Sequence, residues 1–169
     1  MLRQGFTVVE IVITITIMGI LLVLAVVNLN NSQINARDDE RKADVKSITD
    51  ALESFYIAGS DTSTVLRQYP ETTAVNTEAK IRAVLRDVNM DSFISPGTTT
   101  VAATFIMATN AVQTESGVTP LPTINQYVYQ PLSSTNALCT AVATECRKYN
   151  IFYRLEGDNS VYKMMSKNQ

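Results

Sequence analysis

The stretch from Phe6 to Val27 reads FTVVEIVITITIMGILLVLAVV and differs in composition from the rest of the chain. Glu10 is its one charged residue, and the run from Ile11 to Val27 carries no charge. As an α-helix the stretch would be about 33 Å long, which is enough to cross the hydrocarbon core of a membrane. Its apolar residues show no 3.6-residue periodicity, so the sequence predicts a helix that is apolar on all sides, in lipid or in a densely packed fibre core.

A cleaved secretory signal is the alternative interpretation of the same stretch. Residues 1–5 form a short leader whose one basic residue is Arg3, the apolar run is long for a signal peptide, and residues 24–27 lack a small-x-small cleavage site. These features favour a membrane-spanning helix. Arg3 and the free amine precede the span, whereas the charges of residues 37–42 sum to zero beyond it. This asymmetry predicts an amino terminus on the inside and the bulk of the chain on the outside.

The helical pattern continues beyond the span with a different surface. Asp38 and Arg41 interrupt the apolar side of this second part, so we expect packing on a globular core from about Val45 to Tyr56 and an exposed neck before it. Gly59 supplies a stop, which gives one helix of about 80 Å if it is continuous. The apolar side at three- and four-residue steps consists of Ile34, Val45, Ile48, Leu52 and Phe55.

The remainder of the chain predicts a small α+β head. Apolar residues at helical spacing predict a second helix over residues 77–89. Residues 99–109 and 126–130 are rich in β-branched and aromatic residues and predict strands. Residues 148–155 and 160–165 predict an antiparallel hairpin around a Gly-Asp-Asn turn.

These elements predict an α+β fold in which one long amino-terminal helix carries a small antiparallel sheet on its carboxy-terminal half, while its hydrophobic half protrudes. The expected organisation is a leader at 1–5, a hydrophobic membrane or fibre-core helix at 6–28, an amphipathic continuation of the same helix at 29–58, and a globular head at 59–169.

Composition argues against several classes of function. The net charge is −2, which indicates no overall attraction to nucleic acid or anionic lipid. Histidine is absent, and no nucleophile–base pair or metal cluster can be named, so we expect neither an enzyme nor a metal or cofactor site. Cys139 and Cys146 are close in the chain, and an even number of cysteines in an exported protein predicts a disulfide. Two buried thiols are the alternative.

Glu10 is the unusual residue of the apolar stretch, because a carboxylate in hydrocarbon costs about 2.5 kcal/mol or more. Cutting the chain after Gly5 would create a cationic amine on Phe6. In a fibre, the amine of one subunit could meet Glu10 of a displaced neighbour, which would neutralise both charges and set the axial register. The alternative is that Glu10 lies at the membrane interface and is solvated there.

Gly5, Phe6, Thr7 and Glu10, followed by the uncharged run, resemble the class III signal and amino-terminal helix of type IV pilins and of type II secretion pseudopilins. Gly19 also stands where this family commonly has glycine. The resemblance is close over about the first thirty residues and looser over residues 36–53. In the head it concerns architecture alone.

The resemblance implies that a prepilin peptidase cleaves between Gly5 and Phe6 and methylates the Phe6 amine, and that Phe6 and Glu10 serve subunit docking. It implies the major subunit of a type IV pilus, a homopolymeric surface filament for adhesion, motility or DNA uptake. The precursor would be a single-pass protein of the inner or cytoplasmic membrane, and the mature chain would become part of an extracellular fibre. The pilus assembly platform and minor pilins would be its other partners.

The chain departs from the family where many pilins carry a helix-kinking proline, because Val27 and Asn28 occupy that place. The polar residues at 28–32 have a lower helix propensity and could form a local weak point. A pseudopilin of a secretion or competence machine is the alternative within the family. A monomeric, single-pass anchored binding protein is the alternative of another class.

Two weaker hypotheses concern the end of the chain. Basic residues and tyrosines there could touch DNA, although a solvated sheet face is the favoured interpretation. A turn with carboxylates could contact calcium, although an ordinary polar turn is favoured. The residues of the first hypothesis are Tyr127, Tyr129, Tyr149, Tyr153, Arg147, Lys148, Arg154, Lys163 and Lys167, and those of the second are Glu156, Asp158 and Asn159.

Overall fold

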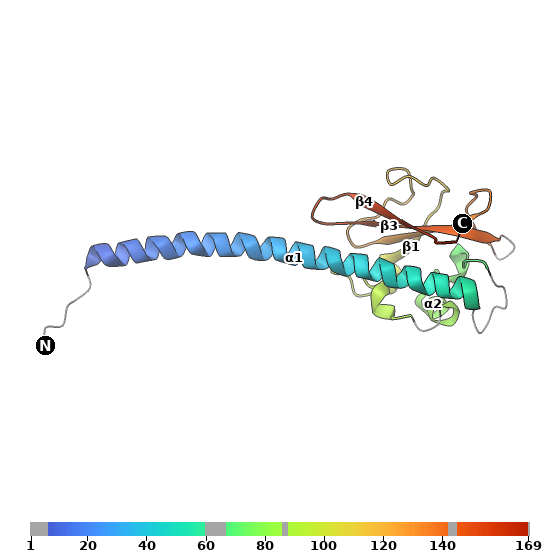
Figure 1. Cartoon of the computed structure of the whole chain (residues 1–169), viewed down its shortest axis with the longest axis horizontal. Helices are drawn as coiled ribbons and strands as arrows, with labels where there is room; N and C mark the ends of the chain where they lie inside the picture. Colours follow the sequence, from blue (N-terminus) through green and yellow to red (C-terminus); the bar gives the residue numbers. More distant parts are fainter. Residues whose placement is uncertain (1–6, 60–66, 86–87, 142–144, 169) are drawn as a thin grey trace.

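The structure is a computed structural model that describes residues 7–59, 67–85, 88–141 and 145–168. One helix, α1 (Val8–Ala58), contains 51 residues and is about 76 Å long at about 1.5 Å per residue. The first half of α1 protrudes from the head, and the second half lies along it (Figure 1). Thr7 caps the start of α1, and Gly59 ends it with a φ of 68°, its N–H donating to the carbonyl of Phe55 at 2.7 Å. The predicted helix and its stop at Gly59 are confirmed.

Among the described residues, the head contains a four-stranded sheet in the order β1–β2–β3–β4. Its strands are β1 (Phe105–Met107), β2 (Tyr127–Ser133), β3 (Cys146–Arg154) and β4 (Val161–Met165). The β3–β4 hairpin agrees with the prediction.

The expectation of an antiparallel sheet is wrong for one pair, because β1 pairs with β2 in parallel. The β2–β3 and β3–β4 pairs are antiparallel, so the sheet is mixed. A parallel pair needs a crossover connection, and residues 108–126 supply it by passing over the face of the sheet that lies away from α1. Ala108 and Val118 of this crossover pack with Val128 and Phe152 of the sheet in a small second core.

The predicted strand over residues 99–109 is largely wrong. Its first part is a helical turn, α3 (Val101–Thr104), and the strand proper is limited to β1. The Thr104 hydroxyl accepts the N–H of Ser95 and lies 2.7 Å from the hydroxyl of Thr98. These side-chain bonds stabilise a folded turn where composition alone favours an extended chain.

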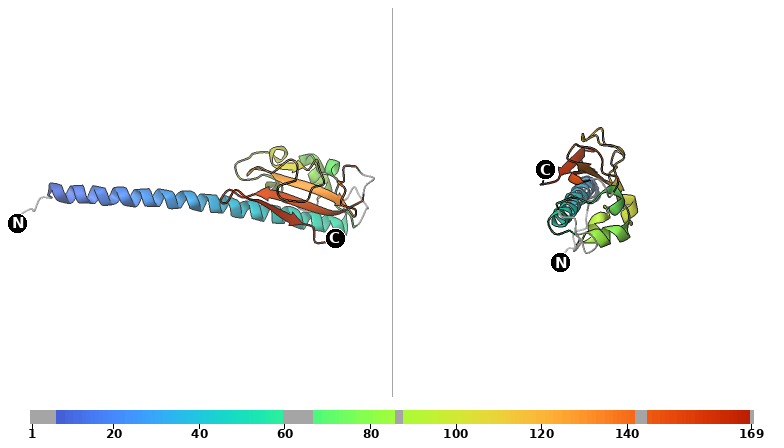
Figure 2. Two further views of the ribbon diagram at one scale, coloured as in Figure 1. Left: turned by 90° about the horizontal axis from the view of Figure 1, so that it is seen from above. Right: turned by 90° about the vertical axis from the view of Figure 1, so that its right-hand side faces the viewer.

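The second helix, α2 (Glu78–Val84), is shorter than predicted. Thr77 caps its start, and Leu85, in an extended conformation, ends it, so the helix stops at Val84 instead of residue 89. Two short 3₁₀ turns flank it, η1 (Thr72–Ala74) and η2 (Met90–Phe93). Seen end on, the strands lie on one side of α1 and the segment with α2 on another (Figure 2).

The main core lies between the second half of α1 and the sheet. Val45, Ile48 and Leu52 of α1 are fully buried and belong to one cluster with Tyr129 and Ile151 of the sheet. The expected packing of α1 from Val45 onward is therefore confirmed. Burial of such side chains contributes roughly 1.5–3 kcal/mol each, which makes this seam the main attachment of the head to α1.

The expected exposed neck is confirmed for residues 28–36, which are mostly exposed, and is wrong from Asp38 onward. Asp38 is 6 % exposed and Arg41 is 1 % exposed, because the turn between β3 and β4 and the segment around Ile124 cover them. The head therefore extends over α1 about two helical turns further toward the amino terminus than the apolar pattern indicates.

Candidate assembly surface

The first half of α1 presents an apolar surface without a covering partner among the described residues. Its described large apolar side chains, from Val8 to Leu29, are 49–78 % exposed. The most apolar window has a mean hydropathy of 2.7 and none of it is buried. By length and composition, this half of α1 could cross a membrane.

The polar groups of this half are satisfied within the helix. The Thr7 hydroxyl accepts the N–H of Glu10 at 3.3 Å, which caps the first turn. The hydroxyls of Thr14 and Thr16 donate to the carbonyls of Ile11 and Val12 at 2.8 and 2.7 Å. Neither threonine hydroxyl therefore needs a partner from outside, which suits lipid or a dry helix bundle.

Glu10 lies in the first turn of α1, where the helix dipole favours a negative charge. Within residues 7–59, 67–85, 88–141 and 145–168, its interactions are those of its backbone, and its carboxylate pairs with no cation. Gly5 and Phe6, the predicted cleavage and methylation site, lie outside the described residues. Their roles, and the docking role of Phe6 with Glu10, stay predictions.

A partly buried charged cluster holds the head just after the protruding half of α1. We call Arg37, Asp38, Arg41, Glu156 and Gly157 the clasp. The Asp38 carboxylate accepts the N–H groups of Glu156 and Gly157, each at 2.8 Å, and the Arg41 Nη1 at 2.9 Å. A Cβ on Gly157 would be 3.2 Å from Asp38 Oδ2, so this close approach favours glycine.

Two arginines complete the clasp. Arg37 donates to Glu156 in a bidentate pair at 2.9 and 2.7 Å. Arg41 donates to the carbonyl of Ile124 at 2.7 Å and lies 3.5 Å from Glu156. Burial alone would raise the pKa of Asp38, but the two backbone N–H groups and Arg41 outweigh it and lower that pKa. The clasp therefore binds the β3–β4 turn to α1 with ionised groups.

The turn between β3 and β4 is more than the ordinary polar turn that the sequence indicates. Glu156 is engaged by Arg37, and the Asp158 carboxylate accepts the N–H of Ser160 and the hydroxyl of Tyr162. These carboxylates bind protein groups, which argues against the calcium interpretation.

A second buried acid, Glu53, binds the end of the chain. No local pattern of the sequence predicts this role. Its carboxylate accepts the hydroxyls of Tyr69 and Tyr149 at 2.9 and 3.0 Å. It also accepts the N–H of Lys167 and the side-chain amide of Asn168. The carboxy-terminal residues are thereby attached to the second half of α1.

Cys139 and Cys146 lie side by side in the core, 0 % and 1 % exposed, and are present as thiols in hydrogen-bond contact. Burial raises the pKa of both thiols. Their backbone carbonyls accept the N–H groups of Thr72 and Tyr69, so the pair also holds the segment that follows α1. The geometry brings the two cysteines together, and the disulfide stays a prediction.

The four tyrosines named for stacking against DNA are buried, so both the stacking hypothesis and the favoured solvated sheet face are wrong for them. Tyr127, Tyr129 and Tyr149 are at most 1 % exposed and Tyr153 is 8 % exposed, because they form the core face of the sheet. Basic residues of this region bind neighbouring groups: Lys163 donates to the carbonyl of Gln113, Arg154 to that of Pro122, and Arg147 pairs with Glu145. The rings of these four tyrosines are therefore not accessible for stacking with bases.

No protein-family model, curated protein or solved structure matches the chain. Its function is therefore argued from its residues and their geometry. The exposed apolar half of α1, together with Glu10, is the strongest indication of function.

Proposed function

We propose that the chain is a structural subunit of a type IV pilus, which is anchored in the membrane as a precursor and then polymerises through the first half of α1. The observation that carries this proposal is a protruding half-helix that is apolar on all sides and has one acid near its start. Such a surface needs lipid or other helices around it, because water around so much apolar area is unfavourable.

The residues of this half suit both environments. Before assembly, the helix spans the membrane with its threonine hydroxyls bonded to its own backbone. During assembly it leaves lipid for a bundle of identical helices. Because lipid is as apolar as the bundle, packing and charge pairing determine the stability of the fibre more than exclusion of water does.

Glu10 supplies the charge pairing in this proposal. A prepilin peptidase cuts between Gly5 and Phe6 and methylates the new amine, which stays cationic. The amine of one subunit then lies against Glu10 of a neighbour displaced along the fibre. An unmatched charge in a dry core is costly, so this pair selects one axial register.

The clasp supports the same function because it attaches the head rigidly to α1. Arg37, Asp38 and Arg41 bind the β3–β4 turn just beyond the apolar half. In a bundle of parallel helices this attachment keeps each head at the outside of the fibre. The heads then form the surface that meets the environment.

The amino terminus of the native protein tests the proposal. We expect mass spectrometry of the purified chain to find a mature protein that begins at Phe6 and carries one extra methyl group. A native chain that still begins at Met1 contradicts the proposal and favours a monomeric, anchored binding protein.

Substitution of Glu10 tests the assembly step. We expect Glu10→Gln to reduce surface filaments at least about ten-fold, because it leaves a neighbour's amine unmatched at a cost of about 3–5 kcal/mol in a buried pair. Electron microscopy and the amount of sheared fibre measure this loss. Asp39→Asn is the matched control, since Asp39 lies at an exposed position of the same helix. Equal filament numbers in both variants contradict the proposal.

The location of the assembly separates the two members of the family. Abundant extracellular fibres that contain this chain indicate a pilin. A short assembly that stays in the cell envelope indicates a pseudopilin of a secretion or competence machine.

A further inference from the structure

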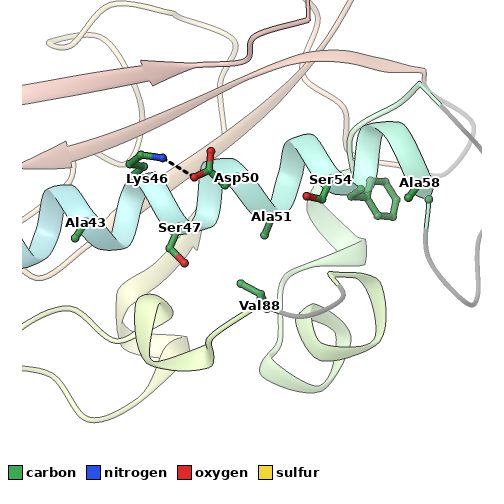
Figure 3. A pocket seen from close by; sticks show the side chains of 10 residues that line it. Ala43, Lys46, Ser47, Asp50, Ala51, Ser54, Ala58 and Val88 are labelled. Carbon is green, nitrogen blue, oxygen red and sulfur yellow. Dashed lines mark hydrogen bonds and ion pairs between the residues drawn. The ribbon is translucent and has the colours of Figure 1, made fainter.

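A groove of about 660 Å³ runs along the second half of α1 (Figure 3). One wall is the helix itself, and Val88 lies across from Ser47 and Ala51 on the opposite side. The helix wall consists of small side chains at steps of four, four, three and four residues: Ala43, Ser47, Ala51, Ser54 and Ala58. This spacing is the one by which a second helix packs along a first at a shallow angle.

The charged groups at the groove lie on one flank. Lys46 and Asp50 are 2.6 Å apart there, and Lys167 reaches Asp50 at 3.2 Å. The small residues of the helix wall are themselves uncharged. An apolar helix can therefore lie against them without burying an unpaired charge.

We propose that this groove is the docking site for the apolar half of α1 of a second copy of this chain. The inference rests on the proposed function and names the surface that receives the protruding helix. The lengths agree: the groove extends from Ala43 to Gly59, about 24 Å, and the apolar run from Ile11 to Val27 is also about 24 Å long.

The apolar half has a surface that fits such a wall. A hollow lies beside Gly19, where a Cβ would have no atom within 4 Å, and Ile15, Ile20 and Val23 border it. Small residues on facing helices let the backbones approach closely, which strengthens packing where lipid offers no hydrophobic gain. When the hollow of one copy faces the small-residue wall of another, both surfaces allow the two helix backbones to approach closely.

A second copy, rather than the same chain, has to fill the groove. The apolar half is one continuous helix with the groove wall, so it cannot fold back onto it. A copy displaced along the helix axis by about 48 Å brings its Gly19 beside Ala51 of the first copy. Parallel orientation follows, because all copies enter the fibre from the same membrane.

Cross-linking between two differently tagged copies tests this contact. One copy carries Ile15→Cys, at the hollow, and the other carries Ser47→Cys, which this displacement places side by side, and both are expressed in full length in cells and oxidised briefly. We expect the disulfide-linked pair at least about ten-fold more often than for Ile15→Cys with Thr135→Cys, an exposed control position in the head, because docking raises the local concentration of the two thiols. The native cysteines are buried and are present in all samples.

Filling the groove is the second test. Ser54 is exposed, so Ser54→Trp fills the groove without disturbing the core, and we expect it to remove both the cross-link and the filaments. Ser54→Ala should retain both. Glu78→Trp, at an exposed position of α2, controls for the addition of a large ring.

The outcomes separate this inference from the proposed function. Wild-type filament numbers with Ser54→Trp, or no cross-link between positions 15 and 47 in cells that make filaments, overturn the docking site and leave the pilus function intact. A cross-link in cells that never make filaments supports the docking site and overturns the pilus function. Cross-linking of position 47 to an unrelated protein alone also overturns the docking site.

Discussion

The two halves of α1 belong to one continuous helix but are stabilised in different ways. Leu22 in the first half is 66 % exposed, whereas Leu52 in the second half is fully buried against the sheet. The second half is amphipathic and has its own core, so tertiary packing within the chain stabilises it. The first half has no such core in the described chain. Its apolar surface therefore needs a covering from outside the described chain, such as the lipid or the neighbouring copies of the proposed function.

The clasp lies at the boundary between the two halves and gives the largest expected effect on stability. Arg41→Ala should lower the free energy of unfolding of the head by about 3–5 kcal/mol, because Asp38 is left as an unpaired buried charge. Urea denaturation of the detergent-solubilised chain, followed by circular dichroism, measures this change. Lys42→Ala is the matched control: Lys42 pairs with Asp39 at an exposed site, and we expect a change below about 1 kcal/mol. Similar losses in both variants would show that the clasp is not buried in solution.

A pair of leucine substitutions sharpens the comparison of the two halves. Leu52→Ala should destabilise the head by about 2–5 kcal/mol, because it leaves a cavity in the core. Leu22→Ala should leave the unfolding of the head unchanged within about 0.5 kcal/mol, because Leu22 is exposed on the half of α1 that protrudes from the head. Its effect should be seen instead in the amount of filament. A large loss of head stability from Leu22→Ala would mean that the two halves are not independent.

Asp44, in the second half, gives a smaller, pH-dependent effect. Burial raises the pKa of Asp44 to about 6, even though the hydroxyl of Tyr127 donates to it at 2.8 Å. Glu40 and Asp91 raise this pKa further, and Arg41 lowers it.

Because its pKa is raised, Asp44 of the folded chain keeps a proton at pH values where Asp44 of the unfolded chain, with the ordinary pKa of 3.8, has released it. The free energy of unfolding should therefore fall as the pH rises from about 4 through about 6, by roughly 1–2 kcal/mol with allowance for solvent screening. Asp44→Asn should remove this part of the pH dependence and stabilise the head at about pH 7 by a similar amount. Denaturation curves across this pH range measure it, and Asp39→Asn, at an exposed position, serves as the control. Parallel curves for the wild type and Asp44→Asn would contradict the assignment.

Local patterns of the sequence predicted the parts of the fold that depend on neighbouring residues. Residues 45–56 show the spacing of a helix with one buried face, and Gly59 ends the helix as expected. The β3–β4 hairpin follows from alternation on both sides of a turn. The exposed apolar half and Glu10 are likewise visible in composition alone, so the candidate site was largely predictable.

Contacts between distant residues were not predictable in this way. In the sequence, Asp38 and Arg41 stand among other charged residues and resemble surface charges. Their burial depends on Glu156, which lies 118 residues further along the chain than Asp38. Glu53 is similar, because its partners come from Tyr69, Tyr149 and the end of the chain. The parallel pairing of β1 depends on the path of the crossover, which no local pattern encodes.

The sequence by itself determined that this chain has a long helix, that half of the helix needs an apolar environment, and that one acid interrupts that half. These properties follow from side-chain chemistry and helical periodicity, which act over a few residues. Tertiary structure alone decided how far the head extends along α1, which charges are buried, and where a groove of small residues is left open on its surface. Those features depend on how distant segments pack together, because burial and charge pairing are properties of the folded surface and not of any one segment.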